Sequence, residues 1–242
     1  TRAQLQANCV STVSMSERAR EITRKRLLGR EVYAGIDWGA DGIASTVLSL
    51  GTYEGNKFRI FWIHQFTGEL SDPDKQLKAI IDLLRAFGVT MIGADYGAGF
   101  VQNNTLTREF GDRLKKYQYA SRTRKKVVYE DRLRRFIVNR SEVMSDVFSA
   151  LKRGNVLELP RWEEFQMPYG REIMNIYTEY NEKLRMLQYA HRPDRPDDTF
   201  HSIAYCFLVS MINHPRPDII TPRREIAGRG VVSSDPGIIG QG

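Results

Sequence analysis

Four acidic residues in the sequence lie where a predicted strand ends or a predicted helix begins. Asp37 and Asp95 each follow a short apolar run that has the composition of a buried strand. Asp197 and Asp198 come just before a long stretch with apolar residues at helical spacing. Functional groups in open α/β sheets collect where the strands end. We therefore expect these carboxylates to gather at one edge of a sheet.

Carboxylates that share a site repel one another, and each raises the pKa of its neighbours. Divalent cations remove that cost, and hard carboxylate oxygens suit Mg²⁺ or Mn²⁺. Two such ions, about 3.5–4 Å apart, can activate a water molecule and stabilise the leaving oxygen during phosphodiester cleavage. Each aspartate alone could instead be a turn residue or a helix N-cap. Their order and their positions together favour a metal site that hydrolyses phosphodiesters.

The distribution of charge indicates a polyanionic partner. The 242-residue chain has 36 Lys+Arg and 29 Asp+Glu, a net charge of +7. Residues 107–140 alone contain twelve Lys or Arg and four Asp or Glu. Such a basic stretch favours nucleic acid over an ordinary solvated face. The residues that we expect to contact the DNA backbone are Arg122, Arg124, Lys125, Lys126, Lys183 and Arg185.

Several classes of protein are disfavoured by composition. The two cysteines, Cys9 and Cys206, give no disulfide framework, and no Cys/His cluster has the spacing of a zinc site. The longest mostly apolar run, 203–212, is shorter than the roughly 20 residues that cross a bilayer. No Gly-Lys dipeptide occurs, so the sequence has no Walker A loop.

The order of predicted elements favours a mixed α/β sheet flanked by helices in a single domain, and not an alternating parallel, doubly wound sheet. The predicted strands are 32–36, 43–50 and 57–66, as an antiparallel meander, then 90–95, 117–120 and 127–129. The predicted helices are 74–87, 104–110, 141–152 with Ser141 as N-cap, and 198–212. Segments 172–180 and 184–191 read as a β-hairpin, although 172–180 could also be helical.

The ends of the chain differ from its middle. We expect 1–30 to be a basic arm outside the core, with a helix from 16 to 30 capped by Ser16. Residues 31–214 would form the globular domain. Residues 215–242 are rich in Pro and Gly and read as a tail. The start at Thr1, without an initiator Met, suggests a piece of a longer protein.

Three short motifs carry a resemblance to a known family. They are Gly-Ile-Asp-Trp-Gly at 35–39, Ala-Asp-Tyr-Gly-Ala-Gly at 94–99, and Pro-Asp-Asp-Thr-Phe-His-Ser-Ile-Ala-Tyr at 196–205. Over about 32–213 the sequence resembles the ribonuclease H-like nuclease domain of the large terminase subunit of tailed bacteriophages. The resemblance implies cleavage of double-stranded viral DNA during genome packaging, with little sequence specificity and with two divalent cations, Mg²⁺ or Mn²⁺.

The resemblance also implies roles for individual residues. Asp37 would bridge the two metals, Asp95 would hold one of them and Asp198 the other. Asp197 could be a ligand, a supporting group or the helix cap. His201 lies one turn beyond Asp198, where it could bond a metal-bound water or a ligand carboxylate, or simply pack as a satisfied histidine.

Partners follow from the same resemblance. Proteins of this family carry an N-terminal ATPase domain in the same polypeptide, and they act with the portal protein and the small terminase subunit. The expected location is the cytoplasm of the infected bacterial host, with no membrane involved.

Three alternatives remain open from the residues. An actin-like or sugar-kinase-like phosphotransferase also uses Asp-x-Gly turns, but it is usually longer and needs no Asp pair on a final helix. A non-catalytic DNA-binding module would fit the basic stretch equally well. Within the nucleases, a Holliday-junction resolvase would prefer branched DNA to linear duplex.

Overall fold

The computed structural model describes residues 1–26, 29–39, 45–121, 125–182, 186–192 and 194–214. One mixed sheet of eight strands organises this part of the chain, in the order β6-β7-β5-β4-β1-β2-β3-β8. The strands are β1 (Tyr33–Asp37), β2 (Thr46–Glu54), β3 (Lys57–Phe66), β4 (Met91–Asp95), β5 (Leu114–Ala120), β6 (Val127–Glu130), β7 (Arg135–Asn139) and β8 (Leu157–Glu158). The single-domain ribonuclease H-like α/β arrangement predicted from the sequence is confirmed.

The strand directions place the ends of two central strands together. The predicted meander is present, because β1 pairs antiparallel with β2, and β2 with β3. On its other side β1 pairs in parallel with β4, and β4 pairs in parallel with β5. The sequence pattern does not predict strands β7 and β8. β1 and β4 therefore run side by side and both end at an aspartate.

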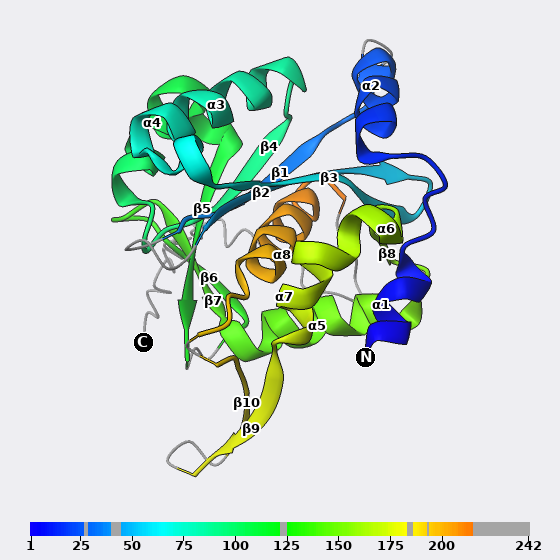
Figure 1. The fold of residues 1–242 in the computed structure, drawn as a ribbon. Helices are drawn as coiled ribbons and strands as arrows, with labels where there is room; N and C mark the ends of the chain where they lie inside the picture. The colour runs from blue at the N-terminus through cyan, green and yellow to red at the C-terminus, as the bar shows by residue number, and fades with distance from the viewer. Residues whose placement is uncertain (27–28, 40–44, 122–124, 183–185, 193, 215–242) are drawn as a thin grey trace, which may run out of the picture.

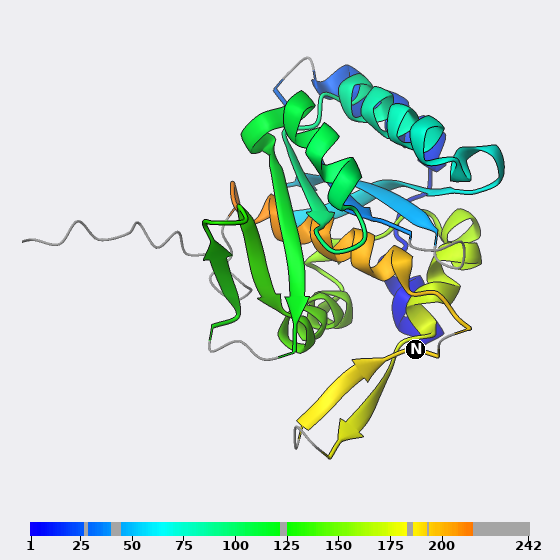
Figure 2. The ribbon, with the colours of Figure 1, turned by 90° about the vertical axis from the view of Figure 1, so that its left-hand side faces the viewer.

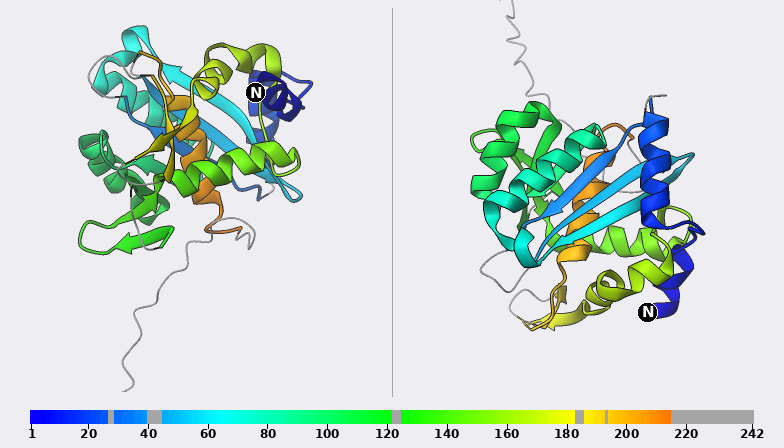
Figure 3. Two further views of the ribbon diagram at one scale, coloured as in Figure 1. Left: turned by 90° about the horizontal axis from the view of Figure 1, so that it is seen from below. Right: turned by 45° about the horizontal axis from the view of Figure 1, so that its top comes forward.

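Helices cover both faces of the sheet (Figure 1). One face carries α2 (Met15–Arg26), α3 (Pro73–Ala86) and α4 (Phe100–Phe110), which lie in front of the strands in the right-hand view of Figure 3. The other face carries α1 (Arg2–Asn8), α5 (Arg140–Arg153), α6 (Trp162–Phe165), α7 (Arg171–Met174) and α8 (Asp198–Ser210). No helix in these described residues is long and apolar enough to span a membrane.

Helix α8 lies directly against the backbone of the central strands. A Cβ atom added at Gly35 would be 2.0 Å from the Ser202 carbonyl oxygen, and one added at Gly93 would be 2.4 Å from that of Tyr205. The absence of side chains at these two glycines therefore lets the helix approach the sheet. All thirteen residues of α8 are buried.

This close approach gives a first prediction. Gly35→Ala is expected to lower the free energy of unfolding by more than about 3 kcal/mol, because the clash is with backbone atoms that cannot rotate away. Gly170→Ala is the matched control, since its added Cβ meets nothing nearer than 3.4 Å. Urea denaturation of the two variants measures the difference. Equal stability of both variants would contradict the described packing of α8.

Three local expectations need correction. The arm 1–30 is not outside the core, because Leu5 and Ile22 are buried in it. The side chain at the start of α2 that bonds Glu17 belongs to Ser14, not Ser16. Helix α5 is capped by the Asn139 side chain, not by Ser141, because α5 begins one residue earlier than predicted.

The segment 172–180 combines both readings that the sequence leaves open. Its first part belongs to the short helix α7, and its last part is strand β9 (Tyr177–Asn181). β9 pairs antiparallel with β10 (Met186–Ala190), so the predicted hairpin is confirmed. The hairpin projects away from the sheet (Figure 2). The tail 215–242 lies outside the described residues.

Candidate metal-dependent active site

Asp37 and Asp95 meet at one edge of the sheet because their strands are parallel neighbours. The residues just before them, Ile36 and Ala94, are paired in register. Helix α8 begins at Asp198 on the same side, as its packing over β1 and β4 requires. Burial, followed by the charges of Asp95 and Asp198, raises the pKa of Asp37 well above its usual value. The Asp37 carboxylate thus lies close enough to those of Asp95 and Asp198 to be repelled by both.

The Asp95 carboxylate is oriented by two donors. The Ala98 N–H donates to its Oδ2 over 2.9 Å, and the Tyr205 hydroxyl of α8 donates to its Oδ1 over 3.3 Å. Burial raises the pKa of Asp95, although both hydrogen bonds oppose the rise. The Asn103 side chain donates to the Asp95 carbonyl oxygen over 2.6 Å, which ties α4 to the end of β4.

Asp198 is the first residue of α8, and it is 8% exposed. Its Oδ2 accepts a hydrogen bond from the Ser45 N–H over 2.9 Å. Burial raises the pKa of Asp198 to about 6, and the charges of Glu172 and Asp197 add to the rise. The ionised form of a buried carboxyl group beside other negative charges is strongly stabilised by a nearby cation.

Asp197 has a different environment from the other three aspartates. Its Oδ2 lies 3.0 Å from His201 Nε2 and 3.5 Å from the Arg140 guanidinium, and its Oδ1 lies 3.6 Å from His191 Nε2. Burial acts to raise the pKa of Asp197, but the His201 hydrogen bond and charge bring it below the usual value. It occupies the N-cap position of α8 without making a capping hydrogen bond. Its charge is therefore compensated by the protein.

His201 connects two groups beside the site. While Nε2 faces Asp197, Nδ1 lies 3.0 Å from the Tyr119 hydroxyl. Both ring nitrogens thus have protein partners, and the residue is 7% exposed. Of the roles that the sequence leaves open, this geometry supports contact with a carboxylate.

Glu172 is a buried carboxylate that the sequence analysis does not identify. It lies on α7 and is 3% exposed. Its Oε2 accepts from the N–H and the hydroxyl of Thr199, over 2.9 and 2.6 Å, and its Oε1 accepts from the Gln65 amide over 3.2 Å. Glu172 thus supplies the capping acceptor for the first turn of α8. No motif marks it, since the contact joins residues far apart in the chain.

These contacts give a second prediction. Glu172→Ala is expected to lower the free energy of unfolding by about 1–3 kcal/mol, because buried donors of Thr199 lose their acceptor. Glu172→Gln keeps an acceptor oxygen and should lose less. Chemical denaturation in EDTA measures the free energies of unfolding of the two variants and of the parent protein. If Glu172→Ala is as stable as the parent protein, Glu172 does not anchor the turn that carries Asp198.

The donor set of the site suits a hard divalent cation. Its potential ligands are carboxylate oxygens, and no hydrogen-bond donor among the described residues contacts the Asp37 carboxylate. Burial and mutual repulsion would both be relieved by a cation. In the described part of the chain, however, no three His, Cys, Asp or Glu side chains already lie in the arrangement of a metal site. The fit therefore rests on the chemistry of the carboxylates.

Four of the six residues expected to contact DNA, Arg122, Arg124, Lys183 and Arg185, lie outside the described residues. Lys125 is exposed in the connection between β5 and β6. Lys126 forms an ion pair with Asp146 of α5. The structure thus does not bring Lys126 to the carboxylates as an unpaired cation.

No family model matches the sequence, and no curated protein matches it either. Solved structures do match. The nuclease domain of the large terminase subunit of bacterial virus Sf6, in a point mutant with manganese and β-thujaplicinol, superimposes with a TM-score of 0.52 at 14% identity. The match covers 80% of this chain and 98% of that domain. The chain has the fold of a terminase nuclease domain.

Other terminase structures also match. The large terminase nuclease of thermophilic phage G20c, with bound zinc, gives a TM-score of 0.47 at 16% identity, over 74% of this chain and 80% of that one. The large terminase of another thermophilic bacteriophage gives 0.44 at 14% identity, over 72% of this chain. The matched part is 38% of the large terminase from that other thermophilic bacteriophage, so this chain spans well under half of the length of that protein.

Proposed function

We propose that this chain is a metal-dependent endonuclease that cleaves double-stranded DNA, with little sequence specificity, during viral genome packaging. The observation that carries the proposal is the meeting of Asp37, Asp95 and Asp198 at one edge of the sheet, where burial raises the pKa of each. The terminase nuclease fold supports the same activity.

The three aspartates would hold two divalent cations, Mg²⁺ or Mn²⁺, with Asp37 between them. When bound, such ions supply Lewis-acid stabilisation and an activated water for hydrolysis. The protein's own part is to fix the carboxylates: Tyr205 and Ala98 orient Asp95, and Ser45 orients Asp198. We assign the third ligand to Asp198 and not to Asp197, because His201 and Arg140 already compensate Asp197.

The proposed role in genome packaging also implies protein partners. An ATPase domain in the same polypeptide, the portal protein and the small terminase subunit would be its partners, in the cytoplasm of an infected bacterium. We propose that this chain itself binds no nucleotide, because hydrolysis of a phosphodiester by metal-activated water needs none. This expectation separates the nuclease from a phosphotransferase.

Cleavage of supercoiled plasmid tests the proposal. The parent protein should nick and linearise DNA with Mn²⁺ or Mg²⁺ and not with EDTA. Asp37→Asn should lose at least 100-fold in rate, the upper range for groups that merely support a metal ligand. Asp74→Asn, an exposed aspartate of α3, is the matched control and should cleave normally.

Two further measurements distinguish the other classes: DNA binding, and the choice between a four-way junction and linear duplex as substrate. DNA binding without cleavage by either protein would favour the non-catalytic binding module. Preference for a four-way junction over linear duplex would favour a resolvase. Equal cleavage by the parent protein and Asp37→Asn would place the active site elsewhere.

A further inference from the structure

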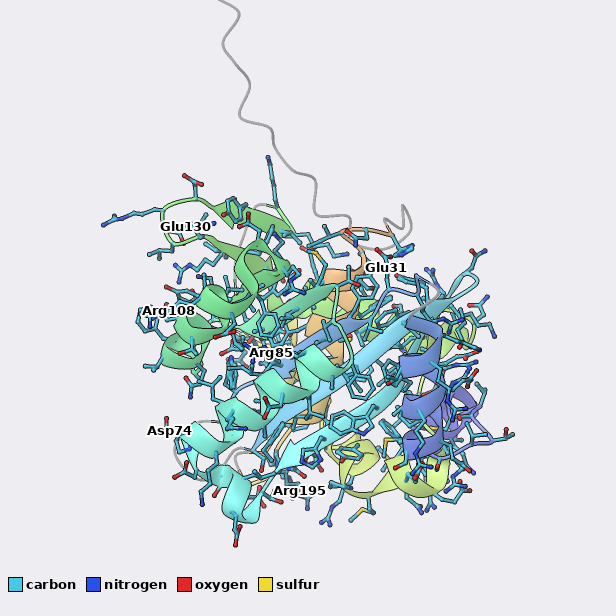
Figure 4. The ribbon with its side chains drawn as sticks, turned by 90° about the horizontal axis from the view of Figure 1, so that it is seen from above. Glu31, Asp74, Arg85, Arg108, Glu130 and Arg195 are labelled. Carbon is cyan, nitrogen blue, oxygen red and sulfur yellow. The ribbon has the colours of Figure 1, made fainter. Side chains whose placement is uncertain are left out.

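A second feature of the molecule, a basic hollow of about 200 Å³, adjoins the end of β4. It lies between α4, β5 and the turn that joins β6 to β7. Its lining includes the side chains of Tyr96, Phe100, Asn104, Lys116, Arg132 and Arg134. Figure 4 labels Arg108 on α4 and Glu130 on β6, both toward the same side of the molecule.

The chemistry of the lining suits an anion. Among the described residues that line the hollow there are three cations and two amide side chains, and none is a carboxylate. Lys116 and Arg132 have no ion pair with any residue that the structure describes. Burial, followed by the charge of Arg134, lowers the pKa of Lys116. A bound anion would compensate these like charges.

One wall of the hollow is rigid and aromatic. The Arg135 guanidinium lies 4.5 Å from the centre of the Tyr96 ring, and it also bonds Glu130 over 2.6 Å. Lys116 Nζ lies 5.9 Å from the same ring. Arg134, which also lines the hollow, pairs with Asp112 over 3.0 Å in an exposed ion pair. Tyr96 and Asp112 thus supply contacts to two of the three cations that line the hollow, Lys116 and Arg134.

The hollow is coupled to the proposed active site through the end of β4. Tyr96 follows Asp95 directly, and its N–H donates to the Tyr117 carbonyl oxygen over 2.7 Å. Asn103, which lines the hollow, donates to the Asp95 carbonyl oxygen. Because successive side chains of a strand alternate, Asp95 faces α8 while Tyr96 faces α4. Asp95 and Tyr96 are adjacent at the end of β4, so a ligand as wide as duplex DNA, laid across this edge of the sheet, would reach both.

We propose that this hollow binds a backbone phosphate of duplex DNA next to the cleavage site, with Lys116 and Arg132 as the principal contacts. The inference rests on the proposed nuclease function for its choice of DNA as the anion. Phosphate contacts position a protein on DNA without reading its sequence, so the hollow would align the strand with Asp95 whatever the bases are.

The test is the salt dependence of duplex binding, measured by fluorescence anisotropy in EDTA so that cleavage plays no part. Each phosphate contact contributes about 0.9 to the slope of log affinity against log salt concentration. Because the hollow would neutralise one phosphate, the double variant Lys116→Gln/Arg132→Gln should lower this slope by about 0.9 on duplexes of unrelated sequence. The matched control, Lys75→Gln/Lys152→Gln, removes two exposed lysines elsewhere and should leave the slope unchanged.

The outcomes separate this proposal from the nuclease function. An unchanged slope in the double variant would overturn the phosphate site, even if the protein cleaves DNA. If Lys116→Gln impairs folding, Arg132→Gln alone, on an exposed turn, should still lower the slope, by up to about 0.9. A lowered slope in a protein that cleaves nothing would support the hollow and refute the nuclease.

A competition arm distinguishes DNA from a free anion. Inorganic phosphate at matched ionic strength should compete with DNA only weakly, because one phosphate site is a small part of the interface. If phosphate abolishes binding by the parent protein and not by the double variant, the hollow is a site for free phosphate. With Mn²⁺ present, the double variant should raise KM for DNA.

Discussion

Asp37→Asn is expected to raise the melting temperature of the metal-free protein while it removes DNA cleavage. Burial and the charges of Asp95 and Asp198 make the ionised Asp37 unfavourable in the folded state. Asparagine removes that charge and keeps the shape. For a domain of this size, each kcal/mol gained raises the melting temperature by about 2–4 °C.

The opposite signs of the two effects distinguish a functional carboxylate from a structural one. Differential scanning fluorimetry, first in EDTA and then in Mn²⁺, measures the melting temperatures of the parent protein and the variant. The parent protein should be stabilised by Mn²⁺ through mass action, and Asp37→Asn should gain much less. Asp74→Asn should follow the parent protein in both conditions. A lower melting temperature for Asp37→Asn in EDTA would mean that the carboxylate serves the fold.

The second large effect is a pH dependence centred on Asp198. Its pKa is raised from the usual 3.8 to about 6, so the folded state holds this proton more tightly than the unfolded state does. Its contribution to stability is therefore present at low pH and is lost as the pH rises through about 6. The full loss corresponds to about 3 kcal/mol.

The comparison with Asp198→Asn isolates this group. All other ionisable groups are shared by the two proteins, so the difference reports the Asp198 carboxyl and its coupling to its neighbours. In EDTA, the variant should gain up to about 3 kcal/mol over the parent protein between pH 4 and pH 8, measured by urea denaturation. Saturating Mn²⁺ should reduce this gain. A difference that stays constant over the pH range would contradict the buried, repelled state of Asp198.

The sequence was sufficient to predict that Asp37, Asp95 and Asp198 gather at one edge of the sheet, for a physical reason. Asp37 and Asp95 follow buried apolar runs, and the parallel pairing of their strands brings them together. The apolar spacing after Asp198 marks the long helix, and Gly35 and Gly93 allow it to approach the sheet. These features are local, so their pattern is visible along the chain.

The features that sequence reasoning misses depend on contacts between distant segments. Glu172 lies on a four-residue helix and bonds Thr199, 27 residues away, so no periodicity reveals it. Strand β7 is a run of only three apolar residues, 136–138, between Arg135 and Asn139, and its burial rises along its length without the alternation that marks a strand. The basic hollow combines Tyr96 with Arg132, and only the fold brings them together.

The N-cap of α5 and the burial of residues 1–30 also depend on contacts that the local sequence does not show. Asn139 and Ser141 are both good N-caps, and the register of β7 decides that Asn139 performs this role. The basic composition of 1–30 obscures Ile22, whose burial holds α2 against the sheet. The sequence of one segment does not show which surface of another segment it packs against in the fold.

Anomalous diffraction from crystals soaked in Mn²⁺ would show whether the acidic cluster is the catalytic metal site. We expect two Mn²⁺ peaks, with the Asp37 carboxylate between them and with Asp95 and Asp198 each in contact with one. Asp37→Asn crystals soaked in parallel should lose at least one peak. Mn²⁺ bound only by other residues, in a protein that cleaves DNA under the same conditions, would contradict the assignment of these carboxylates as the active site.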